Sequence, residues 1–275
     1  MLGAIIGDVI GSRFEGMSNY PRHQNFSLFP KNTRFTDDTV MSVATADAIL
    51  FDRKYRDVYK EYYTRYPKAG YGRSFKMWAK SPVKIPYNSW GNGSAMRISP
   101  VGWAFSTATT VLEEAEKSAK VTHNHPEGVK GAQAVAYAIW MLRIGADKAE
   151  LEEEIVRRFG YDLHPPIKDK WDVSCQGCVP QAFKAFLDSE NFEDCIRRAI
   201  FRGGDSDTIA AIAGSIAEPF YGGVPLYMLE GAFSKLTEDV SNITELFVQT
   251  HVDKDFEKPN VEDYHWRRLF RILIK

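Results

Sequence analysis

Two short acidic clusters carry the residues of this sequence that are best suited to chemistry. They lie at 36–39 (TDDT) and 205–208 (DSDT). Each cluster comes directly before a run of small and apolar residues, 40–46 and 209–217. Such runs with helical spacing predict that each cluster begins a buried helix. Two carboxylates at a buried helix start are costly unless their charge is neutralised.

Two interpretations of these clusters stay open from the residues alone. Asp and Thr are favoured N-cap residues, and a carboxylate suits the positive end of a helix dipole, so capping explains one Asp at each start. Two Asp with a flanking Thr exceed what capping needs, and their oxygens are ligands for hard cations such as Mg²⁺, Mn²⁺ or Ca²⁺. Neither cluster contains His or Cys, which argues against zinc. Under this second interpretation, four converging carboxylates would tolerate two cations, typically about 3.5–4 Å apart.

A glycine-rich segment and two histidines could bind a ligand. Residues 89–97 read SWGNGSAMR, and glycines let a backbone approach an anion closely and point its N–H groups at it. Trp90 offers a face for stacking a base, and 70–72 (GYG) is a similar, weaker segment. Asn-Gly often marks only a turn, and no P-loop Lys follows. His123 and His125 cannot share a helix face at this spacing, so ligand contact and a structural or capping role both stay open.

Composition excludes several classes of protein. The 275 residues carry a net charge of −1, with no basic stripe, which argues against a general nucleic-acid binder. No apolar run of membrane-spanning length occurs, and the apolar N-terminus lacks the basic leader of a signal peptide. The three cysteines favour a reducing compartment and ordinary thiols over disulfides or structural zinc. We therefore expect a cytoplasmic protein that does not bind membranes.

Helical periodicity predicts an all-α chain that folds as one domain, because no linker divides it and no alternating strand pattern occurs. Residues 17–35, 81–99 and 160–173 are expected to be irregular, and the last 20 residues to form a helix docked on the surface. A polar stripe of Asp8, Ser12 and Glu15 would lie on one helix face if the first helix extends that far. The expected helices are 2–12, 39–51, 55–66, 72–80, 100–105, 109–120, 126–144, 148–159, 178–189, 191–201, 207–217 and about 225–238.

Five blocks of the sequence share a pattern: Gly7-Asp8 with Phe14-Glu15, then Thr36-Asp37-Asp38-Thr39, Gly91 to Arg97, Thr122-His123, and Gly203 to Thr208. In this order they resemble the ADP-ribosylglycohydrolase family, which includes the dinitrogenase reductase-activating glycohydrolases. No G-x-S-x-G or strand-linked G-x-G-x-x-G motif points elsewhere. The matching stretch runs from residue 3 to about residue 222, and the tail after about residue 250 matches nothing in the family.

The resemblance implies an all-α, single-domain orthogonal helical bundle of the ADP-ribosylglycohydrolase type, with two divalent cations, Mg²⁺ or Mn²⁺. It implies catalytic roles for Glu15, Asp38 and Asp207, and a supporting role beside the metals for Asp8. The metal ligands that it implies are Thr36, Asp37, Asp38, Asp205, Asp207 and Thr208. The residues that it implies for substrate binding are Gly70, Gly72, Ser89, Trp90, Gly91, Asn92, Gly93 and His123.

The expected function is metal-dependent hydrolysis of the glycosidic bond between ADP-ribose and an acceptor, which releases ADP-ribose. The partner would be an ADP-ribosylated protein or nucleotide conjugate, and the enzyme a monomer. Alternatives on the same fold are hydrolysis of O-acetyl-ADP-ribose or removal of ADP-ribose from a nucleic-acid base. A metal-dependent phosphohydrolase and a non-catalytic, crystallin-like binding protein are further alternatives. The latter tends to lose ligands, whereas here every ligand position is filled.

Overall fold

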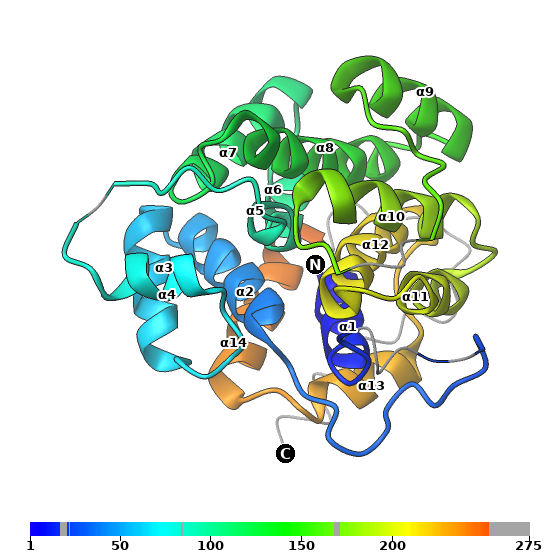
Figure 1. Ribbon diagram of the computed structural model, residues 1–275, viewed down its shortest axis with the longest axis horizontal. Coiled ribbons are helices and arrows are strands. Elements are labelled where there is room, and N and C mark those ends of the chain that lie inside the picture. The colour runs from blue at the N-terminus through cyan, green and yellow to red at the C-terminus, as the bar shows by residue number, and fades with distance from the viewer. Residues whose placement is uncertain (17–20, 22, 84, 168–170, 253–275) are drawn as a thin grey trace.

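Two helices that touch along their backbones lie at the centre of the molecule, α1 (Leu2–Gly11) and α12 (Ser206–Phe220) (Figure 1). The computed structural model describes residues 1–16, 21, 23–83, 85–167 and 171–252. Gly3 and Gly7 lie on the α1 face that contacts α12, and a Cβ at either position would come within 2.1 Å of a carbonyl oxygen of α12. The missing side chains therefore allow the close contact, which places the polar residues of α1 beside the start of α12.

The prediction of an all-α chain is confirmed, since the described residues form helices and no strand. A single antiparallel bridge joins Gly91 to Ser174. The helices other than α1 and α12 are α2 (Asp37–Leu50), α3 (Tyr55–Arg65), α4 (Arg73–Lys80), α5 (Gly93–Met96), α6 (Ser99–Ala104), α7 (Ala108–Lys120), α8 (Pro126–Arg143), α9 (Lys148–Phe159), α10 (Cys175–Leu187), α11 (Phe192–Phe201), α13 (Leu226–Phe233), α14 (Glu238–Phe247) and the π-helix η1 (Val248–Val252).

Three expected boundaries were wrong. The first helix ends at Gly11 with Ser12 as its C-cap, so Glu15 lies beyond it and not on a helical stripe. The region 81–99 contains the short helix α5, whose first residue is a glycine of the glycine-rich segment. The helix expected at 225–238 is two helices, α13 and α14, because the chain turns after Phe233 and restarts at Thr237.

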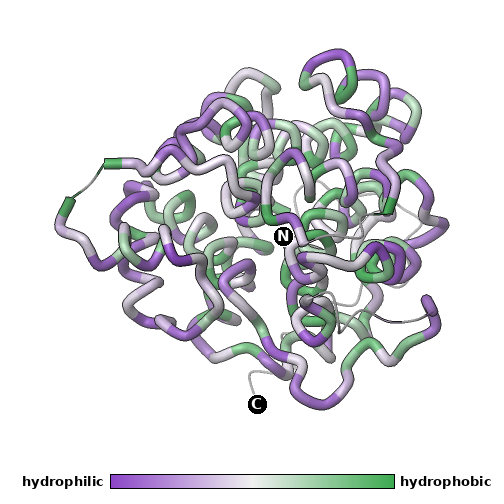
Figure 2. The backbone as a smooth tube through the Cα atoms, in the orientation of Figure 1, coloured by the Kyte–Doolittle hydropathy of each residue, from purple (hydrophilic) through white to green (hydrophobic). Residues whose placement is uncertain are grey.

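The buried apolar side chains form one hydrophobic cluster that runs from Met1 to Val252. Figure 2 shows hydrophobic residues on the central helices and hydrophilic residues on outer helices such as α3 and α9. The three cysteines are buried free thiols within this core. Within the described part of the chain, no helix combines the length and hydropathy needed to cross a membrane. The last 20 residues, expected to form a docked helix, lie outside the described residues.

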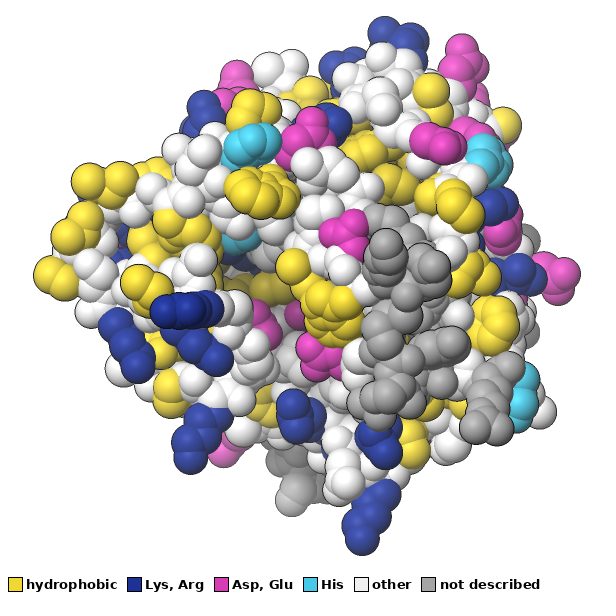
Figure 3. Space-filling model, in the orientation of Figure 1, with side chains coloured by type: hydrophobic (Ala, Val, Ile, Leu, Met, Phe, Trp, Pro, Cys, Tyr) yellow, Lys and Arg dark blue, Asp and Glu magenta, His cyan; other side chains and the backbone are white. Residues whose placement is uncertain are grey.

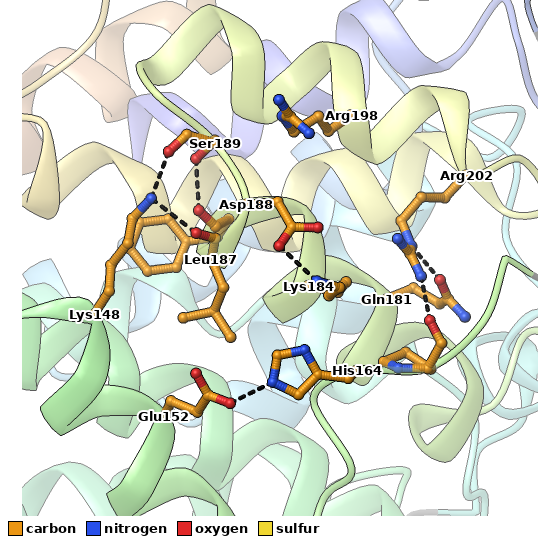
Figure 4. Close-up of polar contacts among 12 residues, drawn as sticks. Lys148, Glu152, His164, Gln181, Lys184, Leu187, Asp188, Ser189, Arg198 and Arg202 are labelled. Carbon is orange, nitrogen blue, oxygen red and sulfur yellow. Dashed lines mark hydrogen bonds and ion pairs between the residues drawn. The ribbon is translucent and has the colours of Figure 1, made fainter.

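Residues 165 and 166, in the segment before α10, are fastened to neighbouring helices. Arg202, the C-cap of α11, donates to the Pro165 carbonyl (2.6 Å), and Gln181 of α10 donates to the Pro166 carbonyl (2.8 Å). Figure 4 shows Arg202 and Gln181 in contact, with His164 paired to Glu152 nearby. These contacts join the chain before α10 to α10 itself and to the end of α11.

Candidate active site

The two acidic helix starts, far apart in sequence, meet in space. The Thr208 hydroxyl donates to Asp38 Oδ2 (3.3 Å), which joins the start of α12 to the start of α2. Carboxylate oxygens of Asp8, Asp38 and Asp207 lie within 4.8 Å of one another, and those of Glu15, Asp205 and Asp207 do the same. The two groups share Asp207, so the acids form one continuous cluster.

Asp8 fixes the start of α2. Its Oδ2 accepts from the backbone N–H groups of Thr36 (2.9 Å) and Thr39 (3.0 Å), and Oδ1 accepts from the Thr36 hydroxyl (2.6 Å). The Thr39 hydroxyl also donates to Asp8. Thr36 is the N-cap of α2 and accepts from the Asp38 N–H (3.3 Å). Capping therefore occupies Asp8 and Thr36, whereas the Asp37 and Asp38 carboxylates extend beyond the cap.

Asp205 is held by Asn92 of the glycine-rich segment. The Asn92 side-chain amide donates to Asp205 Oδ2 (2.5 Å) and contacts the Cys178 sulfur (3.2 Å). Asn92 was expected to bind substrate, but this hydrogen bond orients a carboxylate of the acidic cluster. The backbone N–H of Gly16 donates to the Gly204 carbonyl (3.2 Å), which brings the neighbouring Glu15 to the same cluster.

The acidic cluster is electrostatically strained. Burial, then repulsion from Asp8, raises the pKa of Asp37 to about 8. Burial raises the pKa of Asp38 well above its usual range, with repulsion from Asp8 and Asp37 adding to the effect. The pKa of Asp207 is also far above normal because of burial and the neighbouring Asp205. The carboxylates of this cluster cannot all be ionised in one buried volume unless cations neutralise their charge.

The residues of the acidic cluster fit hard divalent cations. Asp38 Oδ1 is buried and has no hydrogen-bond partner among the described residues, although a buried carboxylate oxygen normally has one. The donors are carboxylate and hydroxyl oxygens, which Mg²⁺ and Mn²⁺ prefer. The buried acidic clusters could therefore hold metal. A bound cation would favour the ionised carboxylates and so oppose the rise in their pKa values.

The acids form the floor of a cavity of about 410 Å³, within the usual range for a nucleotide-sized ligand. Figure 3 shows acidic side chains in the hollow near the middle of this face, with hydrophobic side chains around it. The cavity is lined by Glu15, Asp37, Asp38, Asp205, Asp207 and Thr208 together with seven of the residues expected to bind substrate: Gly70, Gly72, Ser89, Gly91, Asn92, Gly93 and His123.

Trp90 and Thr36 are the two expected site residues that do not line this cavity. Trp90 is 55% exposed, and its ring contacts His125 edge-on at 5.6 Å. The tryptophan that does line the cavity is Trp171, beside Val173. The carbonyl of Val173 accepts from the Asn92 N–H (2.8 Å), so this wall is joined to the glycine-rich segment.

Sequence analysis missed several aromatic and basic residues of the cavity. Tyr71 and Phe75 stack at 5.1 Å with an interplanar angle of 10°, and both line it. Tyr87, Arg73 and Trp171 line it as well. Tyr71 could have been found from its place between two glycines of a suspected ligand loop. Trp171 had no such signal, because its loop has no periodicity.

Alanine substitutions at Gly70 and Gly72 are expected to have different effects. Gly70 has φ +125°, and a Cβ would lie 2.8 Å from Asp37 Oδ1, so Gly70→Ala should lower the melting temperature. Gly72 has φ −61° and nothing within 4 Å of its Cβ position. Gly72→Ala should therefore leave the melting temperature unchanged. If the substrate approaches this backbone, the added methyl group should raise KM for the substrate several-fold. An unchanged KM would remove Gly72 from the substrate-binding residues.

Comparisons with known proteins agree with this geometry. The ADP-ribosylglycohydrolase family model matches residues 1–252. ADP-ribosylhydrolase ARH3 of Gallus gallus is 26% identical, over 81% of this chain and 84% of that protein. ADP-ribosyl-[dinitrogen reductase] glycohydrolase of Rhodospirillum rubrum is also 26% identical, over 80% of this chain and 84% of that protein. A solved structure described as an ADP-ribosylglycohydrolase-related protein complex shares the fold, with a TM-score of 0.71, 23% identity and coverage of 90% and 96% of the two chains.

Proposed function

The chain belongs to the ADP-ribosylglycohydrolase family and is a hydrolase of ADP-ribose glycosyl bonds; we propose that it requires two divalent cations and releases free ADP-ribose from an acceptor. The observation that carries the proposal is the convergence of two acidic helix starts on the floor of a glycine-lined cavity. The single hydrophobic cluster supports our proposal that this part of the chain is one domain.

The proposed cation ligands are the residues that the family resemblance implies. Asp38 and Asp207 belong to the acid group that also contains Asp8, and Asp205 is oriented by Asn92. The Thr208 hydroxyl lies beside Asp38, and Asp37 faces the cavity. Thr36 is the remaining implied ligand, with its hydroxyl committed to Asp8. When bound, the cations would supply positive charge that orients the ribose hydroxyls and lowers the pKa of a water molecule.

The protein groups would divide the remaining work. Cleavage of a glycosidic bond passes through an oxocarbenium-like transition state, so negative charge near the ribose is stabilising. Glu15 lies in the acid group with Asp205 and Asp207, and it lines the cavity. Its carboxylate would take a proton from the attacking water or assist departure of the acceptor. Gly91 and Gly93 would let the diphosphate approach the backbone.

Metal removal tests the central claim. We expect EDTA to reduce ADP-ribose release roughly a hundredfold or more, and added Mg²⁺ or Mn²⁺ to restore it, since metal charge contributes several kcal/mol. The assay is chromatographic detection of free ADP-ribose from a panel of Arg-linked, Ser-linked and base-linked conjugates and O-acetyl-ADP-ribose. EDTA already saturated with Mg²⁺ is the matched control.

The same panel identifies the acceptor, because the released partner differs for each conjugate. Unchanged release in EDTA would contradict the proposed metal dependence. Release of inorganic phosphate without ADP-ribose would indicate a phosphohydrolase and would contradict the proposed reaction.

A further inference from the structure

Arg97, the last residue of the glycine-rich segment, is buried, and within the described part of the chain none of its hydrogen bonds is to an acidic side chain. Arg97 is 1% exposed, and its guanidinium lies 4.4 Å from the centre of the Tyr59 ring. Nη2 donates to the Ser118 carbonyl and to the Thr122 hydroxyl, both at 3.0 Å. Burying a guanidinium without a carboxylate is costly, so its position calls for a role beyond packing.

The hydrogen bond from Arg97 determines what the Thr122 hydroxyl can do. A guanidinium has donors and no acceptor, so Thr122 Oγ1 must accept from it. The same oxygen lies 2.7 Å from His123 Nδ1. The hydroxyl has one proton of its own: given to Nδ1, it makes that nitrogen the acceptor, and given to another group, it leaves Nδ1 as the donor. The first arrangement is a chain of donors from Arg97 through Thr122 to His123.

His123 carries a single proton in this setting. Burial, with the charge of Arg97 adding to it, lowers the pKa of His123 well below its usual range, so the ring is neutral. A neutral imidazole has one N–H, which lies on Nε2 when Nδ1 accepts from Thr122 and on Nδ1 when it donates to Thr122.

The Nε2 atom lies against the glycine-rich segment, in a residue that lines the ligand cavity. It lies 3.0 Å from the position that a Cβ would take at Gly93 and 3.6 Å from that at Gly91, so it sits against the glycine-rich segment. His123 lines the cavity, and its Nε2 has no hydrogen-bond partner in the described part of the chain. An N–H in this position can donate to a ligand oxygen.

We propose that Arg97 and Thr122 are positioning residues that fix His123 as the Nε2–H tautomer, so that it donates a hydrogen bond to a phosphate or ribose oxygen of the substrate. The role in binding rests on the proposed function, whereas the tautomer itself does not. The rival arrangement involves Tyr87, whose hydroxyl also interacts with Thr122. If Thr122 gave its proton to Tyr87, His123 would carry its proton on Nδ1 and present a bare Nε2 that repels a phosphate oxygen.

The tautomer can be read directly by long-range ¹H–¹⁵N correlation spectra of the full-length protein labelled with ¹⁵N-histidine. The His123 resonances are identified by their loss in His123→Asn. We expect the wild-type protein near pH 7 to show the Nε2–H pattern without any substrate added. Thr122→Val, which keeps the side-chain shape and removes the hydroxyl, should bring in the Nδ1–H form. Thr122→Ser should restore the wild-type pattern.

Kinetics provide a second readout. Thr122→Val should raise KM for an ADP-ribosylated peptide roughly tenfold, as the loss of one hydrogen bond implies, with kcat changed much less and Thr122→Ser near wild type. An Nδ1–H pattern for His123 in the wild-type protein would overturn the inference, whatever the behaviour of Thr122→Val. An Nε2–H pattern in a protein that hydrolyses no ADP-ribose conjugate would refute the proposed function and leave the tautomer standing.

Discussion

Replacing Asp38 by asparagine should reduce kcat/KM for ADP-ribose release roughly a thousandfold while raising the melting temperature of the metal-free protein. Asp38 is buried, and its pKa is raised well above normal by burial, Asp8 and Asp37. Asparagine keeps the shape of the aspartate side chain and removes its repulsion with the carboxylates of Asp8 and Asp37. It also removes the negative charge that would bind a cation. A change of 1 kcal/mol in stability corresponds to roughly 2–4 °C in a protein of this size.

The pH dependence of this effect has a definite sign. A carboxyl group whose pKa is raised on folding binds its proton more tightly in the native state, so its stabilisation is complete below the unfolded pKa, about 4, and is lost as pH rises. The metal-free wild type should therefore lose stability as pH rises above about 4, and Asp38→Asn should lose less. The gain in melting temperature from the substitution should grow with pH.

Asp47→Asn is the matched control for Asp38→Asn. Asp47 is a buried aspartate on the same helix, but it pairs with Arg53 (2.7 Å) and accepts from the Tyr62 hydroxyl (2.9 Å). Its substitution should lower stability and leave turnover intact. Differential scanning calorimetry in EDTA and in Mg²⁺ measures both variants, and Mg²⁺ should raise the melting temperature of the wild type but much less that of Asp38→Asn. If Asp38→Asn destabilised the metal-free protein as Asp47→Asn does, the acidic cluster would be a network of satisfied contacts and no metal site.

The helices could be predicted because their signals are local. The helix expected at 148–159 has the bounds of α9, and the structure adds a capping box of Asp147 and Glu150 at its start. The division of 225–238 into α13 and α14 was missed because the break contains no proline or glycine pair that marks it. The short helix α5 was missed because its glycine start is typical of a turn.

The central helix contact was predictable from a pattern that went unused. Gly3, Gly7 and Gly11 recur every four residues, which places them on one face of α1, and 209–217 is a second run of small residues. Together these features indicate two helices in backbone contact. That contact brings Asp8 to the acidic cluster, so the glycine spacing carries information about the site as well as the fold.

Which side chains face the cavity was harder to predict. Trp90 follows Ser89 in a suspected ligand loop, yet its ring turns to His125, and Trp171 from an irregular segment lines the cavity instead. Loop direction depends on distant contacts such as that of Arg202 with the Pro165 carbonyl, which no local spacing reveals. The Asn92 side chain likewise donates a hydrogen bond to Asp205, a contact with a residue 113 positions away that local spacing does not reveal.

Glu15→Gln is expected to lower kcat for ADP-ribose release by roughly 10²- to 10⁴-fold, the range typical of general acid–base groups, with little change in melting temperature. Glutamine has the same shape and can hold a water molecule but cannot take its proton. Stopped assays of free ADP-ribose at saturating substrate give kcat. Glu113→Gln, on the exposed side of α7, is the matched control and should leave kcat unchanged.

The response to metal separates two roles that the geometry allows for Glu15. Its carboxylate belongs to an acid group with Asp205 and Asp207, so it could bind a cation as well as transfer a proton. Burial and repulsion from Asp205 raise its pKa, while Arg34 opposes the shift, which favours a group that exchanges protons. If Glu15 transfers a proton, Mg²⁺ will still raise the melting temperature of Glu15→Gln as it does that of the wild type. If that response disappears together with the rate, Glu15 is a metal ligand, and the proton must be transferred by another group.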